Sequence, residues 1–339
     1  MRVAVLGAGI MGASCARWLA EAGHQTTVFD QFAPGHSFGS SHGGQKIVRQ
    51  AYPDPFHTGI LLKAHALWRE LEDACGLPIY HEVGLAYISQ EAHAGAMAKM
   101  LSTTGVLNQT VYVLPEPMVL SNGEAAVLTP GAGWVSTQNA LDGTLALARA
   151  AGAELIHHKV GNLEELRDFD HRVITAGPWA GTFLNLRLRP TLQTSAYFQG
   201  HYEGPVWIEG FGHEVYGFPN EPGSDCFKVG FHTAGPDADL GSADRLVQEA
   251  QVAALIDVAR RRFQMDQPTV RSTFSCIYTR TLDERFRIGL LEPGTIVVSA
   301  CSGHGYKFAP WVGRLVSRMA IGKEQPPPEF DLTDADRIS

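Results

Sequence analysis

The segment from Gly7 to Gly12, Gly-Ala-Gly-Ile-Met-Gly, constrains the fold of this chain more than any other feature. It follows a short apolar run at residues 2–6 and precedes a stretch of helix-forming residues, 13–22, that ends before Gly23. This order predicts a buried strand, a tight turn and a helix. Glycines in such a turn let the backbone approach a pyrophosphate closely, and the helix N-terminus then faces the phosphate charge. The sequence therefore predicts a nucleotide-binding turn in its first residues.

A carboxylate strengthens this interpretation. A second strand is predicted at residues 25–29, and Asp30 follows it, 18 positions after Gly12. An acidic residue at about this distance from the turn accepts hydrogen bonds from the ribose hydroxyls of a bound dinucleotide. Strand, turn, helix and carboxylate together are far more specific than the glycines alone, but they do not separate NAD from FAD.

Composition excludes several other classes of protein. The 339 residues are 45% hydrophobic and 18% charged, as in ordinary globular proteins. Lys and Arg number 27 against 35 Asp and Glu, so the net charge of -8 gives no overall footprint for nucleic acid or an anionic membrane. No apolar run approaches the roughly 20 residues of a membrane span. The five cysteines share no close-pair spacing, which argues against a disulfide framework and a metal site, and a reducing cytoplasm is expected.

Hydrophobic periodicity predicts an α/β sheet in the first half of the chain. Helices are predicted at residues 60–75 and 139–151, and strands at residues 154–157 and 172–175. Alternation of helices and strands is typical of a parallel sheet covered by helices.

The pattern changes between about residues 186 and 279, where short alternating runs are separated by Pro and Gly. These runs predict a mainly antiparallel sheet. A strand at residues 295–299 and a helix at 308–320 then restore the α/β pattern, and the prolines at 326–328 predict an extended terminus.

Five blocks of sequence carry a resemblance to a known family. They are residues 39–52, rich in Gly, Ser and His, and residues 216–219, 228–232, 276–279 and 302–308. In this order, spread between residue 1 and about residue 320, they resemble the monomeric sarcosine oxidase and N-methyltryptophan oxidase family, FAD-dependent amine oxidases of the D-amino-acid oxidase superfamily. The resemblance therefore selects FAD as the cofactor.

The resemblance implies an α/β fold in which a glutathione-reductase-like FAD-binding domain is interleaved with a mainly antiparallel-sheet substrate domain. The FAD-binding domain would comprise residues 1–82, 131–185 and 283–339, and the substrate domain residues 83–130 and 186–282. The implied reaction is oxidation of a small secondary amino acid, N-methyl or cyclic, with transfer of a hydride equivalent to flavin N5. The imine is then hydrolysed and O2 is reduced to hydrogen peroxide. A monomer is the family default.

Lys228 and His232 share one face of a predicted strand because alternate residues of a strand point the same way. Taken alone, a lysine on such a strand is more often exposed to solvent. The resemblance instead places Lys228 above the flavin, where its charge promotes the reaction with oxygen. His232 would contact the substrate, although a purely structural histidine is the alternative.

Cys276 would carry the flavin as a thioether on its 8-methyl carbon, whereas a buried free thiol is the ordinary alternative. Arg49 and Lys307 would clamp the substrate carboxylate. Lys46 stands where the family has an arginine beside the flavin, and a lysine offers charge without the planar guanidinium. His42 would lie by the dimethylbenzene edge of the flavin.

The residues implied for the chemistry are Lys228, His232, Tyr216, Tyr278, Lys307, Lys46 and Arg49. Those implied for the cofactor are Gly7, Gly9, Ile10, Met11, Gly12, Asp30, Gln31, Ser40, His42, Gly43, Lys46, Val160, Ala176, Gly177, Trp179, Cys276, Gly303, His304, Gly305 and Lys307.

The connector between Val160 and Arg172 is short where the family has a longer β-meander, which predicts a trimmed FAD domain. Side-chain selectivity would come from residues 86–120 and 197–211. Alternatives are a glycine-oxidase-like enzyme or a flavin dehydrogenase of a primary or cyclic amino acid, and a non-catalytic flavoprotein subunit. A nicotinamide dehydrogenase fits less well, because Cys276 and the loop at 302–308 would have no cofactor to meet.

Overall fold

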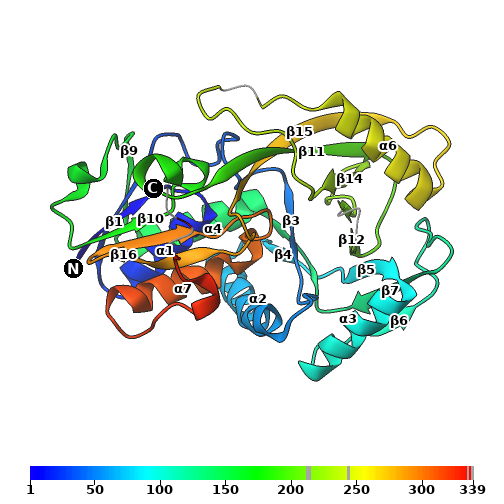
Figure 1. Cartoon of the computed structure of the whole chain (residues 1–339), viewed down its shortest axis with the longest axis horizontal. Helices are drawn as coiled ribbons and strands as arrows, with labels where there is room; N and C mark the ends of the chain where they lie inside the picture. Colours follow the sequence, from blue (N-terminus) through cyan, green and yellow to red (C-terminus); the bar gives the residue numbers. More distant parts are fainter. Residues whose placement is uncertain (211–214, 243–244, 334–335, 337–339) are drawn as a thin grey trace.

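In the computed structural model the glycine turn connects a strand of a six-stranded sheet to the following helix. The structure describes residues 1–210, 215–242, 245–333 and 336; the remaining positions of the segments expected at 186–282 and 283–339 lie outside the described residues. Two sheets and their helices lie side by side in Figure 1, joined by long strands along the top of the view. This arrangement confirms the α/β class with a mainly antiparallel second sheet.

The six-stranded sheet is parallel except at one edge. Its order is β16 (Arg287–Glu292), β17 (Thr295–Ser299), β10 (His171–Ile174), β1 (Arg2–Leu6), β2 (Gln25–Asp30) and β9 (Glu154–His157), and only β16 pairs antiparallel. Alternate side chains of β1 point to opposite faces of the sheet, and both sets are apolar, so each face must be covered. Val3 and Val5 pack into one apolar core, whereas Ala4 and Leu6 pack into another on the opposite face.

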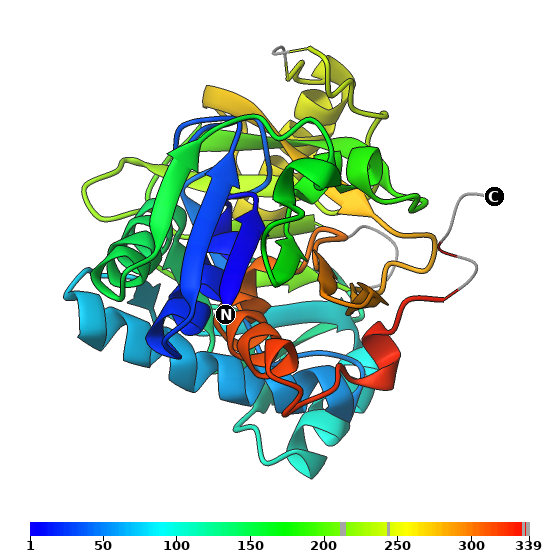
Figure 2. The same cartoon turned by 90° about the vertical axis from the view of Figure 1, so that its left-hand side faces the viewer.

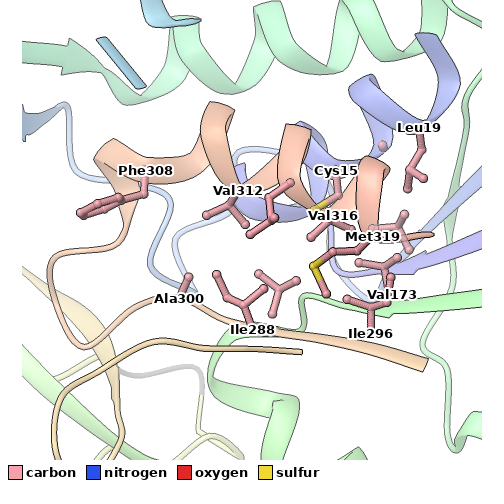
Figure 3. Packing of buried hydrophobic residues seen from close by; sticks show 14 of the residues in the cluster. Cys15, Leu19, Val173, Ile288, Ile296, Ala300, Phe308, Val312, Val316 and Met319 are labelled. Atoms are coloured by element: carbon pink, nitrogen blue, oxygen red, sulfur yellow. The ribbon is translucent and has the colours of Figure 1, made fainter. Parts of the chain in front are cut away.

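Helices cover the first of these faces. They are α1 (Ile10–Glu21), α2 (Pro55–Cys75), α4 (Thr137–Ala150) and α7 (Ala309–Ala320). In Figure 2, α2 (light blue) and α7 (orange) lie below the first strands (blue). Figure 3 shows Val312, Val316 and Met319 of α7 beside Cys15 of α1 and above Ile296 of β17. Cys15 is fully buried in this core, and burial raises the pKa of its thiol, so it serves packing rather than chemistry.

Local capping explains why α2 begins earlier than its periodicity predicts. The carboxylate of Asp54 accepts a hydrogen bond from the backbone N–H of His57 at 2.8 Å, and Pro55 occupies the first helical position. These two residues start the helix before Ile60, the first residue of the predicted apolar period, is reached.

The opposite face of the sheet is covered by irregular chain. The connector after β9 forms a single 3-10 turn, η1 (Leu163–Leu166), and the segment after β10 contains η2 (Gly177–Trp179) and the short α5 (Ala180–Phe183). Leu166 packs there in the core that holds Leu6. The connector is therefore as short as the sequence indicates, and its leucines still cover the sheet.

The extended terminus predicted at residues 326–328 is wrong in part. A 3-10 turn, η4 (Pro328–Phe330), folds back, and the ring of Phe330 is fully buried. It lies 5.3 Å from the ring of Phe56 and 5.3 Å from that of Phe286, between centroids. An aromatic side chain after three prolines anchors the segment because it buries a large apolar area.

The second sheet has eight strands. Its order is β15 (Val270–Arg280), β11 (Arg189–Gln199), β14 (Cys226–Phe231), β13 (Val215–Phe218), β12 (Val206–Glu209), β5 (Leu85–Gln90), β7 (Glu124–Thr129) and β6 (Gln109–Val111). All neighbours pair antiparallel except β12 and β5. Helices α3 (Glu91–Thr103) and α6 (Glu249–Phe263) pack on its strands. A small third sheet, β3 (Gln45–Val48), β8 (Gly133–Ser136) and β4 (Tyr80–His81), completes the described strands. Among the described helices, none is long and apolar enough to cross a membrane.

One buried arginine ties α6 to two strands of this sheet. The side chain of Arg262 is fully buried; it donates to Glu209 at 3.0 Å and to Glu124 at 2.7 Å. Glu209 also accepts from Arg261 at 3.0 Å. The charges of these four residues balance, so the network can remain ionised away from water.

Replacing Arg262 with methionine is expected to lower the free energy of unfolding by ~3–5 kcal/mol, because half-buried Glu124 loses its arginine and buried Glu209 loses one of its two. Unfolding in urea, followed by circular dichroism, measures the change. The matched control is Arg260→Met on the same helix, where the ion pair with Asp257 is exposed and the expected change is within about 0.5 kcal/mol. Equal effects of the two substitutions would contradict the role of the buried network.

Candidate active site

A large cavity is lined by residues of both sheets and reaches the glycine turn. Its volume is about 1270 Å³, and its walls come from the turn after β1, the loop before β3, strands β13 to β15 and the loop after β17. Cavities that hold one small ligand are commonly about 300–1,000 Å³. This cavity is therefore large enough for a dinucleotide together with a small substrate.

The glycine turn fits a pyrophosphate. Gly7 has φ +108°, and a side chain there would strike the backbone of Thr175. Helix α1 follows with no cap from its own N-cap residue, Gly9, and no acidic residue in its first turn, so its positive end can face phosphate. Gly9, Ile10 and Met11 line the cavity. Gly12 does not line it; a Cβ there would lie 1.7 Å from the carbonyl oxygen of Gly7, so this glycine lets the turn pack on the helix.

Asp30 lies at the end of β2, beside the turn, as the spacing predicts. One carboxylate oxygen accepts from the backbone N–H of Ala8 at 2.6 Å, and the other from that of Phe32 at 2.9 Å. These bonds fix the carboxylate at the cavity wall, and its remaining lone pairs can accept ribose hydroxyls. Gln31 and Val160 line the same end of the cavity.

The loop before β3 closes over the turn through Ser41, which the sequence did not single out. Its hydroxyl accepts from the backbone N–H of Ile10 at 3.0 Å, where α1 begins. The neighbouring Ser40 instead donates to the carbonyl of Ile277 in β15 at 2.6 Å. Ser41 stands in a Gly-Ser-Ser-His run, and only the tertiary fold shows which of the two serines faces the helix.

Cys276 lies in β15, and its thiol faces the cavity. The ammonium nitrogen of Lys46 is 3.7 Å from its sulfur. Burial alone would raise the pKa of this thiol, but the charges of Lys46 and His42 outweigh burial and lower it to about 6. His42 does not line the cavity; its ring lies edge-on to Phe274, with centroids 6.1 Å apart. The environment therefore favours a thiolate, which is the nucleophilic form of cysteine.

Lys228 is buried at the cavity wall, so the solvent-exposed alternative is excluded. Phe227 and Val229 face the core under α6, as the alternation of β14 predicts. The ammonium of Lys228 donates to the carbonyls of Gly43 at 2.9 Å and Gln45 at 2.8 Å. Gly43 holds this lysine in place but does not itself line the cavity.

Burial also sets the chemistry of Lys228. The pKa of its ammonium lies well below the usual range, mainly because of burial and next because of the charge of Lys46, while Glu221 and Cys276 act in the opposite direction. The ring of Phe218 lies 4.0 Å from the ammonium nitrogen and stabilises its charge. A lysine with a lowered pKa releases its proton more readily than an exposed one.

Arg49 and Lys307 meet at the ring of Tyr52. The guanidinium carbon of Arg49 lies 4.3 Å from the centroid of that ring, and the Lys307 ammonium is 3.4 Å from its hydroxyl. Lys307 also donates to the carbonyl of His304 at 2.7 Å. Within the described part of the chain, neither cation has an ion-pair partner. Burial, followed by the charges of Arg49 and Lys46, lowers the pKa of Lys307 well below its usual range, so a bound anion would stabilise this pair.

The loop after β17 brings Gly303 against the aromatic side of the cavity. Its φ is +78°, and a Cβ would lie 2.2 Å from the ring of Tyr278 and 2.7 Å from that of His232. Burial and then the charge of Arg280 lower the pKa of His232 to about 3, so this ring is neutral. His304 is neutral as well, chiefly through burial, and its Nδ1 lies 3.0 Å from the hydroxyl of Tyr52.

The structure brings the other predicted residues to the same cavity. Those that line it are Gly7, Gly9, Ile10, Met11, Asp30, Gln31, Ser40, Lys46, Arg49, Val160, Ala176, Gly177, Trp179, Tyr216, Lys228, His232, Cys276, Tyr278, Gly303, His304, Gly305 and Lys307. Tyr52, which contacts both Arg49 and Lys307, ends the block 39–52 that resembles the family. It was not among the residues predicted for the site.

Comparisons with known proteins identify the family of this chain. A family model described as FAD dependent oxidoreductase matches residues 2–319. A monomeric sarcosine oxidase of Streptomyces avermitilis is 30% identical over 94% of this chain and 93% of its own. An N-methyl-L-tryptophan oxidase of Salmonella newport is 28% identical over 97% of this chain and 96% of its own. The solved structure of glycine oxidase from Geobacillus kaustophilus has a TM-score of 0.80 at 21% identity, over 98% of this chain and 99% of that one, and shares the fold. The chain therefore belongs to the FAD dependent oxidoreductase family, in which it groups with the monomeric sarcosine oxidases and N-methyltryptophan oxidases.

Proposed function

We propose that the protein oxidises the C–N bond of a secondary amino acid, N-methyl or cyclic, and passes the electrons to O2. The observation that carries this proposal is the pair of cations on Tyr52, Arg49 and Lys307, in the cavity that also contains the glycine turn and Cys276. FAD, when bound, supplies the acceptor for a hydride equivalent and returns the electrons to oxygen. In this proposal the FAD-binding domain comprises residues 1–82, 131–185 and 283–339, and the remaining segments cover the face where the substrate binds.

The cation pair holds the substrate carboxylate. A guanidinium offers a planar fork to a carboxylate, and an adjacent ammonium adds a second charge. Burial and the charge of Arg49 lower the pKa of Lys307. A bound carboxylate raises this pKa again, because its negative charge stabilises the ammonium. Binding is therefore tightest at a pH where Lys307 keeps its proton in the complex.

The amine of the substrate loses its proton in the same surroundings. Arg49, Lys307 and Lys228 place positive charge around the cavity, and nearby cations lower the pKa of an amine. His232 is neutral and adds no charge of its own. No side chain then needs to act as a strong base, and imine hydrolysis follows in water.

Lys228 serves the reaction with oxygen. Two backbone carbonyls hold its ammonium at the cavity wall, so its charge is already in place when oxygen acquires negative charge. Its lowered pKa makes it a competent proton donor at the same step.

Cys276 carries the flavin covalently in this proposal. Replacing it with serine is expected to give a protein whose FAD is released completely by acid denaturation, because serine has no sulfur for the thioether and its hydroxyl is a far weaker nucleophile than a thiolate. Intact mass after denaturation measures the linkage. Cys301→Ser is the matched control, since Cys301 also lines the cavity and accepts from the backbone N–H of Thr279 at 3.3 Å. Covalent flavin in Cys276→Ser, or its loss in Cys301→Ser alone, would assign the linkage elsewhere.

The rate of this attachment is expected to depend on pH through the thiol. With a pKa of about 6, the thiolate fraction is nearly complete at neutral pH and falls about tenfold for each pH unit below that value. Apoprotein mixed with FAD at a series of pH values gives the rate from the covalent mass increment. Replacing Lys46 with methionine removes the charge that lowers the pKa of Cys276 most and is expected to shift the profile to higher pH. A profile that is flat in both proteins would show that ionisation of Cys276 does not control attachment.

Three measurements on the purified protein test the proposed function. Its visible spectrum reports FAD, anaerobic mixing with N-methyl amino acids, proline and pipecolate reports flavin reduction, and admission of oxygen reports reoxidation with peroxide. Rapid reduction with rapid reoxidation supports the oxidase. Reduction that persists in oxygen favours a dehydrogenase, and no reduction by any of these amines overturns the proposal.

A further inference from the structure

The substrate end of the cavity has one continuous apolar wall. It is formed by Ile47 of β3, Tyr87 of β5, Met97 of α3, Ile208 of β12, and Tyr216 and Phe218 of β13; all six line the cavity and pack in the same apolar cluster. This set is called the apolar wall below. Tyr87, Met97 and Ile208 come from the segments 86–120 and 197–211 to which side-chain selectivity was assigned, and residue 211 itself lies outside the described residues.

The apolar wall starts beside the groups that hold and oxidise the substrate. Ile47 precedes Arg49 by two residues, and the charge of Arg49 is near enough to Tyr87 to oppose the rise in its pKa that burial causes. At the other end, Phe218 lies opposite Lys228 in the strand pairing, with its ring 4.0 Å from the ammonium. A carboxylate held by Arg49 therefore leaves the other substituents of the α-carbon within reach of the wall.

The carboxylate of Glu209, beside the apolar wall, is already paired with two arginines. Glu209 lines the cavity next to Ile208, but one carboxylate oxygen accepts from both Arg261 and Arg262 at 3.0 Å and the other from Arg261 at 3.0 Å. A cationic side chain of a substrate would find this carboxylate already neutralised by two arginines, and any charged side chain would lose its water against the apolar wall. The wall thus fits an uncharged, apolar group.

We infer that the preferred substrate is a secondary amino acid whose side chain is apolar and of about the size of a phenyl ring, packed on the apolar wall. This inference rests on the proposed function and narrows the expectation of a small substrate. An apolar group that leaves water for such a wall binds more tightly in proportion to its buried area. Since one methylene in an apolar pocket changes kcat/KM by about 10- to 200-fold, a benzyl group is expected to raise it at least tenfold over the hydrogen of sarcosine.

The test compares sarcosine, N-methyl-alanine, N-methyl-phenylalanine and N-methyl-lysine as substrates of the FAD-loaded enzyme. The expected order of kcat/KM places N-methyl-phenylalanine first and N-methyl-lysine below N-methyl-alanine. Met97→Trp fills the space before the wall and is expected to reduce the ratio of N-methyl-phenylalanine to sarcosine at least tenfold. Met100→Trp is the matched control on the same helix, because Met100 packs behind the wall and does not line the cavity. Sarcosine or N-methyl-lysine as the best substrate overturns the inference and leaves the proposed function intact.

A second measurement is independent of turnover. Propionate and 3-phenylpropionate both offer a carboxylate to Arg49 and Lys307, and their dissociation constants follow from perturbation of the flavin spectrum in the unaltered protein. Tighter binding of 3-phenylpropionate, by about tenfold or more, supports the apolar wall even if none of the amines is oxidised. Equal binding of the two acids overturns the inference, and silence of all amines with selective acid binding overturns the proposed function alone.

Discussion

Replacing Lys228 with methionine is expected to slow the reaction of the reduced enzyme with oxygen by about 10²- to 10³-fold, the loss typical of removing one fixed charge-stabilising donor. Methionine keeps the length of the side chain and removes its charge. In the structure the ammonium is held at the cavity wall by the carbonyls of Gly43 and Gln45 and by the ring of Phe218. Reduction by the substrate, whose carboxylate is held elsewhere, is expected to change by less than about tenfold.

Stopped-flow spectroscopy separates the two half-reactions of this variant. Anaerobic mixing with substrate gives the rate of reduction, and mixing the reduced protein with oxygenated buffer gives the rate of reoxidation. Lys63→Met is a matched control, since Lys63 is exposed on α2. Equal slowing of both half-reactions would contradict a specific role in the reaction with oxygen. Lys228 would then be needed only to keep the site folded.

Replacing Arg49 with methionine is expected to lower kcat/KM for an N-methyl amino acid by about 10²- to 10³-fold, because the loss of one partner of a buried charge pair costs ~2–5 kcal/mol. The guanidinium lies 4.3 Å from the centroid of the Tyr52 ring, and Lys307 approaches the hydroxyl of the same ring. Only Lys307 then remains for the carboxylate. Arg49→Lys is expected to recover part of the loss, since it restores charge without the planar fork.

A substrate without a carboxylate provides the decisive comparison for Arg49. A secondary amine that lacks this group cannot use the clamp, so its slow oxidation by the unaltered protein is expected to change little in Arg49→Met. Steady-state peroxide formation with both kinds of amine measures the difference. If both substrates lost activity to the same degree, the arginine would be acting on folding or cofactor binding rather than on the carboxylate.

Local patterns in the sequence predicted a large part of the fold. The glycine turn, Asp30 and the strand containing Lys228 occupy the expected places, because each depends on a short-range period or on spacing within one strand–helix–strand unit. The start of α2 was placed too late because the cap at Asp54 precedes the periodic residues. The terminal turn was missed because burial of Phe330 depends on rings from Phe56 and Phe286, far away in sequence.

Interactions between distant segments account for what the sequence could not predict in the site. Ser41 and Ile10 lie on different elements, and nothing local distinguishes Ser41 from Ser40. The partly buried bond between Arg262 and Glu124 joins residues 138 positions apart. Pairings of this kind leave no period in the sequence, because each member satisfies its own element equally well without the other.

The order of strands in the six-stranded sheet has a consequence for synthesis on the ribosome. The central strand β1 pairs on one side with β10, and β10 in turn pairs with β17. Both β10 and β17 are synthesised long after β1, which ends at residue 6. At about 5–20 residues per second, β17 follows β1 by roughly 15–60 s, and during this time a growing chain exposes an apolar strand edge that invites aggregation. The loop with Lys307 is made later still, only after β17. The edge of the first strands is therefore exposed for most of synthesis, and the wall of the cavity is complete only after nearly all of the chain has been made.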